Sequence, residues 1–276
     1  MKNIYTIRLT NLEAIPLPPV CRPRINFLIA DGKLAYLQEF PHMVAIGWKD
    51  DGNVSYLCGG SLISNNWVLT AAHCTHNYLG KPRIIKLGSN SLYDTSGKII
   101  KIKKTIRHPD FKRPKFYFDI GLIQLAESVP FDNNIQPACL YSQYETTPRV
   151  VWATGWGSSQ YSSFFEDKID FSDVLLKVKL NVIDNIKCSL AYNSSTAIPY
   201  GVTPSMMCAG DPYGGWKKDT CLGDSGGPIQ TFDMDNCLYQ IVGITSFGKL
   251  CIMTNTPGVY TRVSHYLDWI ESIVWP

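Results

Sequence analysis

The sequence lacks the features that mark several broad classes of protein. No apolar run approaches the roughly 18 residues that a membrane-spanning helix needs. The net charge over 276 residues is only +3, too small to indicate nucleic acid as the main partner. The closest pair of cysteines, Cys208 and Cys221, is 13 residues apart, so there is no Cys-x-x-Cys zinc motif. These absences argue against a membrane-spanning, nucleic-acid-binding or zinc-binding protein.

The amino-terminal end also lacks the apolar core of a signal peptide. In the first 19 residues Arg8, Asn11 and Glu13 interrupt the apolar residues, so there is no signal-peptide core. The nine cysteines nevertheless favour a disulfide framework formed in an oxidising, extracellular compartment. We therefore expect the sequence to be a piece of a longer secreted precursor. Prolines 16, 18, 19 and 23 make residues 1–28 a loop-like propeptide or linker.

After residue 29 the chain consists of many short β-type runs separated by turn residues, which predicts an all-β sandwich or barrel. The runs are Met43–Trp48, Ser61–Leu62, Trp67–Thr70, Ile84–Leu87, Ile99–Ile106, Leu122–Leu125, Val150–Gly155, Val174–Leu180, Gln240–Thr245 and Val259–Val263. The period changes near the end of the chain. Apolar residues from Tyr266 to Val274 recur at helical spacing after Ser264, a candidate N-cap.

The most informative segment is Asp219-Thr-Cys-Leu-Gly-Asp-Ser-Gly-Gly-Pro228. Glycines on both sides of Asp224-Ser225 allow a sharp turn that exposes the serine oxygen beside two amide N–H groups. Asp219, six residues before Ser225, is placed to lie at the bottom of an adjacent pocket. A serine hydroxyl is a weak nucleophile unless a base removes its proton. The rest of the chain must therefore supply that base.

Two further residues fit this chemistry. His73 follows the apolar run Trp67–Leu69 and precedes Cys74, which would fix its backbone. Asp119 is enclosed by aromatic and branched residues, where a carboxylate needs a partner such as an imidazole N–H. The order His73, Asp119, Ser225 is that of a chymotrypsin-type catalytic triad. The other four histidines, His42 among them, are predicted to be structural.

With these residues in place, the chain resembles the trypsin-like serine peptidases from about Ile29 to Pro276, and within them the insect haemolymph proteases of the snake and clip-domain kind. The motifs that carry the resemblance are Phe40-Pro-His-Met43, Cys58-Gly-Gly60, Gly155-Trp-Gly157, Gly243-Ile-Thr-Ser-Phe-Gly248 and Pro257-Gly-Val-Tyr260. The resemblance implies two six-stranded antiparallel β-barrels with the active site between them and a C-terminal α-helix. It divides the chain into a remnant, 1–28, and a peptidase domain, 29–276.

The resemblance also implies roles for the other residues of the site. The N–H groups of Gly223 and Ser225 would form the oxyanion hole. Asp219 would attract a substrate Arg or Lys side chain, with Thr220 beside it and two glycines, Gly248 and Gly258, in the pocket walls. Ser246, Phe247 and Gly248 match the segment that pairs with the substrate backbone, although many relatives carry Trp where this chain has Phe247.

Activation is expected to follow the family pattern, in which cleavage frees an amino terminus that pairs with Asp224. Alignment of Ile29-Ala-Asp-Gly32 places the cut at Leu28–Ile29, so the activating protease would be chymotrypsin- or elastase-like. Asp31 stands where relatives have glycine. Cleavage at Arg24–Ile25 is the alternative, but it leaves four extra residues.

By resemblance we pair Cys58 with Cys74, Cys188 with Cys208, Cys221 with Cys251 and Cys21 with Cys139. Cys237 remains as a buried free thiol or as a bond to another chain. Where many relatives bind calcium, this chain has Ser89 and Gly97 at the expected acidic positions and only Asp94 between them, so we predict no metal there. No cofactor is predicted. Asn53 and Asn193 fit the N-glycosylation pattern.

The sequence thus predicts a secreted serine endopeptidase zymogen that cleaves after Arg or Lys. The resemblance implies an extracellular cascade such as immunity, melanisation or developmental patterning. Its partners would be protein substrates, among them downstream zymogens, and serpin-type inhibitors. Two alternatives remain: a non-catalytic homologue that acts as a binding cofactor, and a digestive or venom enzyme. The first usually lacks a triad residue, whereas all three are present here.

Overall fold

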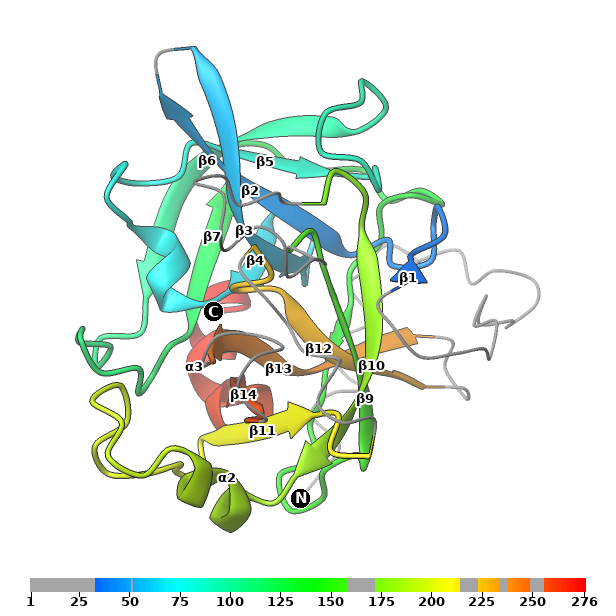
Figure 1. Ribbon diagram of the computed structural model, residues 1–276. Coiled ribbons are helices and arrows are strands. Elements are labelled where there is room, and N and C mark those ends of the chain that lie inside the picture. Colours follow the sequence, from blue (N-terminus) through cyan, green and yellow to red (C-terminus); the bar gives the residue numbers. More distant parts are fainter. Residues whose placement is uncertain (1–32, 51, 158–171, 214–222, 234–237, 249–255) are drawn as a thin grey trace, which may run out of the picture.

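The computed structural model describes residues 33–50, 52–157, 172–213, 223–233, 238–248 and 256–276. These residues fold mainly into two antiparallel β-barrels (Figure 1). In the view of Figure 1, the barrel formed by the blue to green strands lies above the second one. This confirms the all-β fold predicted from the sequence.

The first barrel is closed by six strands in the order β2-β3-β4-β7-β6-β5. Their bounds are β2 (Met43–Asp50), β3 (Asn53–Leu62), β4 (Trp67–Thr70), β5 (Ile84–Leu87), β6 (Lys98–Arg107) and β7 (Gly121–Leu125). All residues of β4 and β5 are buried, whereas β6 is largely exposed. Closure leaves no free edge between these strands.

The second barrel is formed by β9 (Val150–Gly155), β10 (Leu176–Ile183), β11 (Met206–Gly210), β14 (Gly258–Arg262), β13 (Leu238–Phe247) and β12 (Pro228–Asp233), paired in that order. It closes because β9 pairs with both β10 and β12. Two short strands are added at its side: β1 (Lys33–Leu34) pairs with β10, and β8 (Cys139–Leu140) runs parallel to β13.

Several elements were not predicted from the sequence, or were predicted too short. The run Ser61–Leu62 is only the end of the ten-residue strand β3, because Gly59 and Gly60 interrupt its pattern. A Cβ on Gly60 would lie 3.0 Å from the Leu69 carbonyl oxygen, so the glycine allows β3 and β4 to approach. The strands β11 and β12 and the helix α2 (Asn185–Ala191) were also not predicted.

The C-terminal helix is present, but its start was wrongly predicted. α3 spans Leu267–Val274 and its N-cap residue is Tyr266, without a side-chain cap. Ser264 instead lies inside the preceding 3-10 turn, Val263–Tyr266, where it is buried. The chain already turns in the 3-10 segment before α3, so the N-cap position falls at the end of that segment, on Tyr266, and not on Ser264. The apolar face of α3, including Ile270, packs into the same core cluster as first-barrel residues such as Trp67 and Ile123, which links the C-terminus to both barrels.

A buried polar chain connects the start of β2 to the second barrel. His42, only 1% exposed, contacts Gln230 on β12 through Nε2 and Oε1 at 2.5 Å. The Gln230 amide in turn donates to the Thr154 hydroxyl on β9 at 3.1 Å. Burial lowers the pKa of His42 to about 4, although the bond to Gln230 works against this. The imidazole is therefore neutral at neutral pH and acts as a hydrogen-bond donor to Gln230.

Candidate active site

Asp119 lies just before β7 in a turn with unusual backbone geometry. The preceding residue, Phe118, has φ of 59°, a left-handed conformation that costs a bulky residue of order 1–3 kcal/mol. Its ring stacks on His108 with centroids 5.0 Å apart, and its carbonyl accepts the Ile120 N–H at 2.8 Å. This turn directs Asp119 into the protein, where the residue is 0% exposed.

The buried carboxylate of Asp119 is paired with His73. One oxygen, Oδ1, accepts the backbone N–H of His73 at 2.9 Å, and Oδ2 lies 2.8 Å from Nδ1 of the ring. An ionised carboxylate only accepts hydrogen bonds, so the ring proton is on Nδ1. The lone pair of Nε2 is then available as a base. The side chain of His73 is 11% exposed, which leaves one side of the ring accessible.

Two hydroxyl groups complete the surroundings of Asp119. Ser246 donates from Oγ to the carboxylate oxygen Oδ2 at 2.5 Å, and Thr261 donates to the backbone carbonyl of Asp119 at 2.8 Å. Ser246 was predicted from the sequence to belong to the substrate-binding edge, but its contact with Asp119 was not foreseen. Ser246 and Thr261 are separated from Asp119 by 127 and 142 positions in the sequence. They contact it only because β13 and β14 lie beside the first barrel. No local pattern in the sequence indicates such a pair.

The position of His73 is fixed by its neighbours in the chain. It lies in a short 3-10 helix, Ala72–Thr75, directly after β4. Cys74 forms a disulfide with Cys58 on β3, as predicted. The group Cys58, His73 and Cys74 brings three potential metal-ligand atoms together. Both sulfurs are in the disulfide, so they are not available as the thiolates that a metal binds.

Ser225 lies in a tight turn that contacts both barrels. Its carbonyl accepts the N–H of Gly59 on β3 at 2.8 Å, and the next N–H, from Gly226, donates to Thr245 on β13 at 2.8 Å. A Cβ on Gly226 would lie 2.2 Å from the Thr70 hydroxyl and 2.9 Å from the Cys74 sulfur. Only glycine fits there. Gly226, which follows Ser225, therefore packs directly on Cys74, which follows His73.

Further connections place the Ser225 turn beside Asp119 as well. Thr245, which accepts the Gly226 N–H, immediately precedes Ser246, the donor to Asp119. The structure thus brings the backbone of the three predicted triad segments, around His73, Asp119 and Ser225, to one place between the barrels. Before Ser225, Gly223 has φ of 98°, a conformation that favours glycine.

The carboxylate of Asp224 points away from this group toward the end of β9. Its Oδ1 accepts the N–H of Gly157 at 2.9 Å. A Cβ on Gly155 or on Gly157 would lie 2.0 Å or 2.5 Å from a carboxylate oxygen of Asp224. The two glycines are therefore required for the carboxylate to lie in this position.

Aromatic side chains border the His73 ring. Phe116 meets it edge-on, with ring centroids 5.9 Å apart, and Phe247 lies 5.1 Å from Phe116. Beyond Phe247, Gly248 faces Gly258: a Cβ on Gly248 would be 3.9 Å from the Gly258 Cα. Asp219 and Thr220, predicted for the adjoining pocket, lie outside the described residues, as do Leu28 and Ile29.

The predicted disulfides have mixed outcomes. Cys58–Cys74 and Cys188–Cys208 are both present. Cys139 forms no disulfide within the described residues, and its predicted partner, Cys21, lies outside them, so the Cys21–Cys139 bond stays a prediction. Burial, and then the nearby Asp233, raise the pKa of the Cys139 thiol, so it is protonated at neutral pH. Cys21, Cys221, Cys237 and Cys251 lie outside the described residues.

Comparisons with known proteins agree with this geometry. The Trypsin family profile matches residues 29–270. The chain is 41% identical to serine protease snk of Drosophila melanogaster over 263 residues, which cover 92% of this chain and 58% of that protein. It is 35% identical to the clotting factor G beta subunit of Tachypleus tridentatus, covering 92% of this chain and 82% of the relative.

A second Drosophila relative, serine protease Hayan, is 36% identical over 90% of this chain and 39% of its own length. The chain thus spans little more than half of snk and less than half of Hayan. Among solved structures, neuropsin, a serine protease expressed in the limbic system of mouse brain, superposes with a TM-score of 0.71 at 28% identity, over 89% of this chain and 100% of neuropsin. The chain therefore belongs to the trypsin family of serine endopeptidases.

Proposed function

We propose that this chain is an active serine endopeptidase in which Ser225 is the nucleophile, His73 the base and Asp119 the acid that orients it. The observation that carries the proposal is the fully buried Asp119 carboxylate bonded to Nδ1 of His73. A buried charge without a partner would be costly, whereas this one holds the imidazole with Nε2 free to accept a proton.

In the proposed reaction, Nε2 of His73 removes the Ser225 proton as the hydroxyl oxygen attacks the substrate carbonyl. The imidazolium formed is stabilised by Asp119, whose negative charge is kept in place by Ser246 and the His73 N–H. His73 then gives the proton to the leaving amine, and water hydrolyses the acyl-enzyme by the reverse sequence. The N–H groups of Gly223 and Ser225 would stabilise the oxyanion, and each such donor typically contributes about 100- to 1,000-fold to turnover.

We further propose cleavage after Arg or Lys. The support is Asp219, a carboxylate close in sequence to Ser225, together with the two glycines, Gly248 and Gly258, that face each other without side chains. A carboxylate in such a pocket needs a cation, which a substrate Arg or Lys would supply. Thr220 would lie beside it, and the edge at Ser246 and Phe247 would pair with the substrate backbone.

The proposed activation site is Leu28–Ile29, which separates residues 1–28 from the peptidase domain, 29–276. Leu34 pairs with Leu176, which pairs with Gly155, and the Asp224 carboxylate lies against Gly155. Two strand spacings amount to about 10 Å. The five residues 29–33 can span up to about 17 Å. An amino terminus at Ile29 is thus long enough to reach Asp224, whereas one at Ile25 carries four surplus residues.

The setting that we propose is an extracellular proteolytic cascade. The disulfides support an oxidising compartment. One relative is named as a subunit of a clotting factor. Protein substrates, a chymotrypsin- or elastase-like activator and serpin-type inhibitors would then be its partners. Asn53 and Asn193 are both exposed, as glycan attachment requires. Among the described residues, no helix has the length and apolar character needed to cross a membrane.

The proposal is tested by cleaving the purified chain with elastase or chymotrypsin, and separately with trypsin, and sequencing the new amino termini. We expect a terminus at Ile29 to coincide with a burst of product from an Arg-containing ester, and Ser225→Ala to remove the burst. Ile29-terminated protein without any burst would favour a non-catalytic homologue. Activity only with a terminus at Ile25 would move the activation site to Arg24.

Specificity needs a separate comparison. Asp219→Ser should reduce kcat/KM on Arg and Lys substrates far more than on aromatic ones, while Asp268→Ser, at an exposed position on α3, should change neither. An equal loss on both classes of substrate would contradict the assignment of Asp219.

A further inference from the structure

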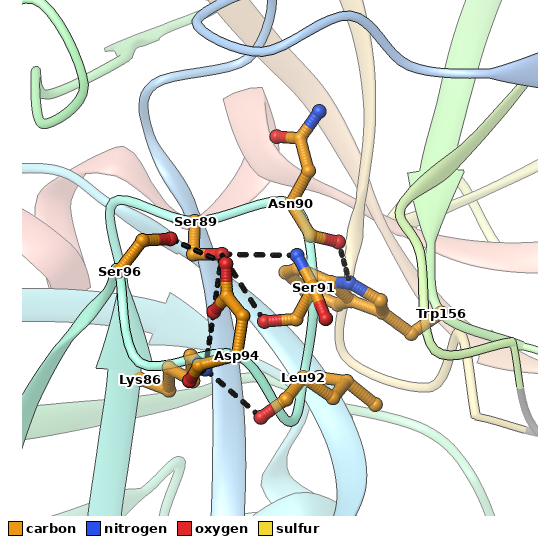
Figure 2. A network of polar contacts seen from close by, with 8 residues as sticks. All are labelled: Lys86, Ser89, Asn90, Ser91, Leu92, Asp94, Ser96 and Trp156. Carbon is orange, nitrogen blue, oxygen red and sulfur yellow. Dashed lines mark hydrogen bonds and ion pairs between the residues drawn. The ribbon is translucent and has the colours of Figure 1, made fainter.

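The loop between β5 and β6, residues 88–97, folds around the ammonium group of Lys86 (Figure 2). The side chain of Lys86 is only 4% exposed. Its Nζ donates to the backbone carbonyls of Leu92 and Asp94 at 3.0 and 2.6 Å, and to the Asp94 carboxylate at 2.8 Å. An ammonium group has three N–H donors, so all of them are used inside the loop.

The carboxylate of Asp94 closes this arrangement from the other side. The hydroxyl of Ser89 donates to it at 2.8 Å, and the hydroxyl of Ser96 donates to Oδ2. Burial works to raise the pKa of Asp94, but the bonds from Lys86, Ser96 and Ser89 outweigh it and lower the pKa to about 2. Asp94 on the loop and Lys86 on β5 therefore form an ion pair, in which the buried Lys86 ammonium is an internal cation beneath the loop.

Asn90 joins this loop to the second barrel. Its backbone carbonyl accepts the indole N–H of Trp156 at 2.8 Å, as Figure 2 shows, and also the N–H of Leu175 at 2.7 Å. Its side-chain amide donates to the carbonyl of Ala35 at 2.8 Å. One residue of the loop thus holds the end of β9, the segment before β10 and the segment that follows the proposed activation site.

Trp156 stands directly before Gly157, whose N–H binds the Asp224 carboxylate. The indole is 5% exposed and packs among apolar residues, including Leu92 of the loop. The turn that receives Asp224 is therefore fixed at one end by a hydrogen bond to the loop. Without that bond the turn would have other positions available, and the Asp224 carboxylate would follow it.

We propose that Lys86 and Trp156 are positioning residues for Asp224: the internal cation shapes the loop, and the loop holds through Trp156 the turn on which Asp224 lies. The inference rests on the proposed function, in which the Ile29 ammonium pairs with Asp224. An α-amino group has an ordinary pKa of about 7.7–8.0. A well-placed carboxylate raises this pKa, because it favours the charged amine. Activity then persists to higher pH.

The test compares Lys86→Met, which keeps the apolar stem but removes the charge, and Trp156→Phe, which keeps an aromatic ring but removes the N–H. Lys101→Met is the matched control, because Lys101 is exposed on the neighbouring strand β6 and lies outside the network. For each protein with a sequenced Ile29 terminus, kcat/KM on an Arg-containing peptide is measured from about pH 6 to about pH 10, a range that brackets the α-amino pKa.

We expect the alkaline pKa of kcat/KM to fall by about one unit in both variants, which corresponds to about a tenfold weaker pairing of the amine. Lys101→Met should behave as the parent protein does. Cyanate, which carbamylates free amines, should also inactivate the two variants faster than the control. If Trp156→Phe fails to fold, Lys86→Met alone gives the same comparison.

The inference is overturned if folded variants keep the alkaline pKa and the cyanate resistance of the parent. Lower thermal stability with an unchanged alkaline pKa would show a purely structural loop, and it overturns the inference as well. A different result identifies failure of the proposed function: the parent protein, correctly cleaved at Ile29, would then show no gain in activity at any pH.

Discussion

The buried imidazole of His42 should make the stability of this protein depend on pH. In the folded protein its pKa is about 4, against 6.5 for an exposed histidine, chiefly because burial disfavours the charged form. As the pH falls below 6.5, the unfolded chain binds a proton at this position while the folded protein does not. The contribution to the free energy of unfolding is therefore complete above pH 6.5 and is lost as the pH falls toward 4.

The size of the effect follows from the shift in pKa. Each unit of difference between the folded and the unfolded state corresponds to about 1.4 kcal/mol. We expect the free energy of unfolding to fall by about 2 kcal/mol between pH 6.5 and about pH 5, and by about 3 kcal/mol by about pH 4. A loss of this size is a large part of the 5–15 kcal/mol that is typical of a folded domain.

The assay is denaturant unfolding followed by tryptophan fluorescence at several pH values, in a Ser225→Ala background that prevents self-digestion. The comparison protein carries His42→Gln in addition. Glutamine does not titrate, and its amide still donates to Gln230, so the hydrogen bond between the barrels is kept. His108 and His265, whose pKa values are also lowered by burial, contribute equally to both proteins. The difference between the two pH profiles isolates His42.

The reasoning would be refuted if both proteins lost the same stability between about pH 7 and about pH 4. Such a result would mean that the folded protein protonates His42 as readily as the unfolded chain does. An overall lower stability of the His42→Gln protein would reflect poorer packing. The decisive observation would still be whether the protein that keeps His42 loses more stability on acidification than the variant does.

Other perturbations have equally definite outcomes. Asp119→Asn should lower kcat about 10⁴-fold with little change in KM, because an amide favours the wrong tautomer of the catalytic ring; hydrolysis of an Arg-containing ester would measure this, and a loss below tenfold would contradict the pairing. Added calcium should leave Tm unchanged, since Lys86 already occupies the oxygens of its loop; a clear rise in a calorimeter would show a metal site. Replacing Cys58 and Cys74 together by serine should cost about 3 kcal/mol, given their separation of 16 residues; equal denaturation midpoints would be inconsistent with this.

Local chemistry made much of the fold and site predictable. The strands β4 and β5 have the bounds that their β-type runs predict, because every residue in them is buried. The turn around Ser225 was recognisable from the glycines beside it. The structure gives the reason at Gly226, because its φ of 76° and its contact with Thr70 exclude any residue with a side chain. Such constraints act on one residue at a time, so the sequence displays them directly.

The order of His73, Asp119 and Ser225, the framework of cysteines and the all-β class were thus determined by the sequence by itself. Tertiary structure decided the contacts between distant residues: Ser246 with Asp119, and Asn90 with Trp156. Each of these depends on how two barrels close and pack together, and that geometry is set by the whole chain at once, so no short stretch of sequence records it.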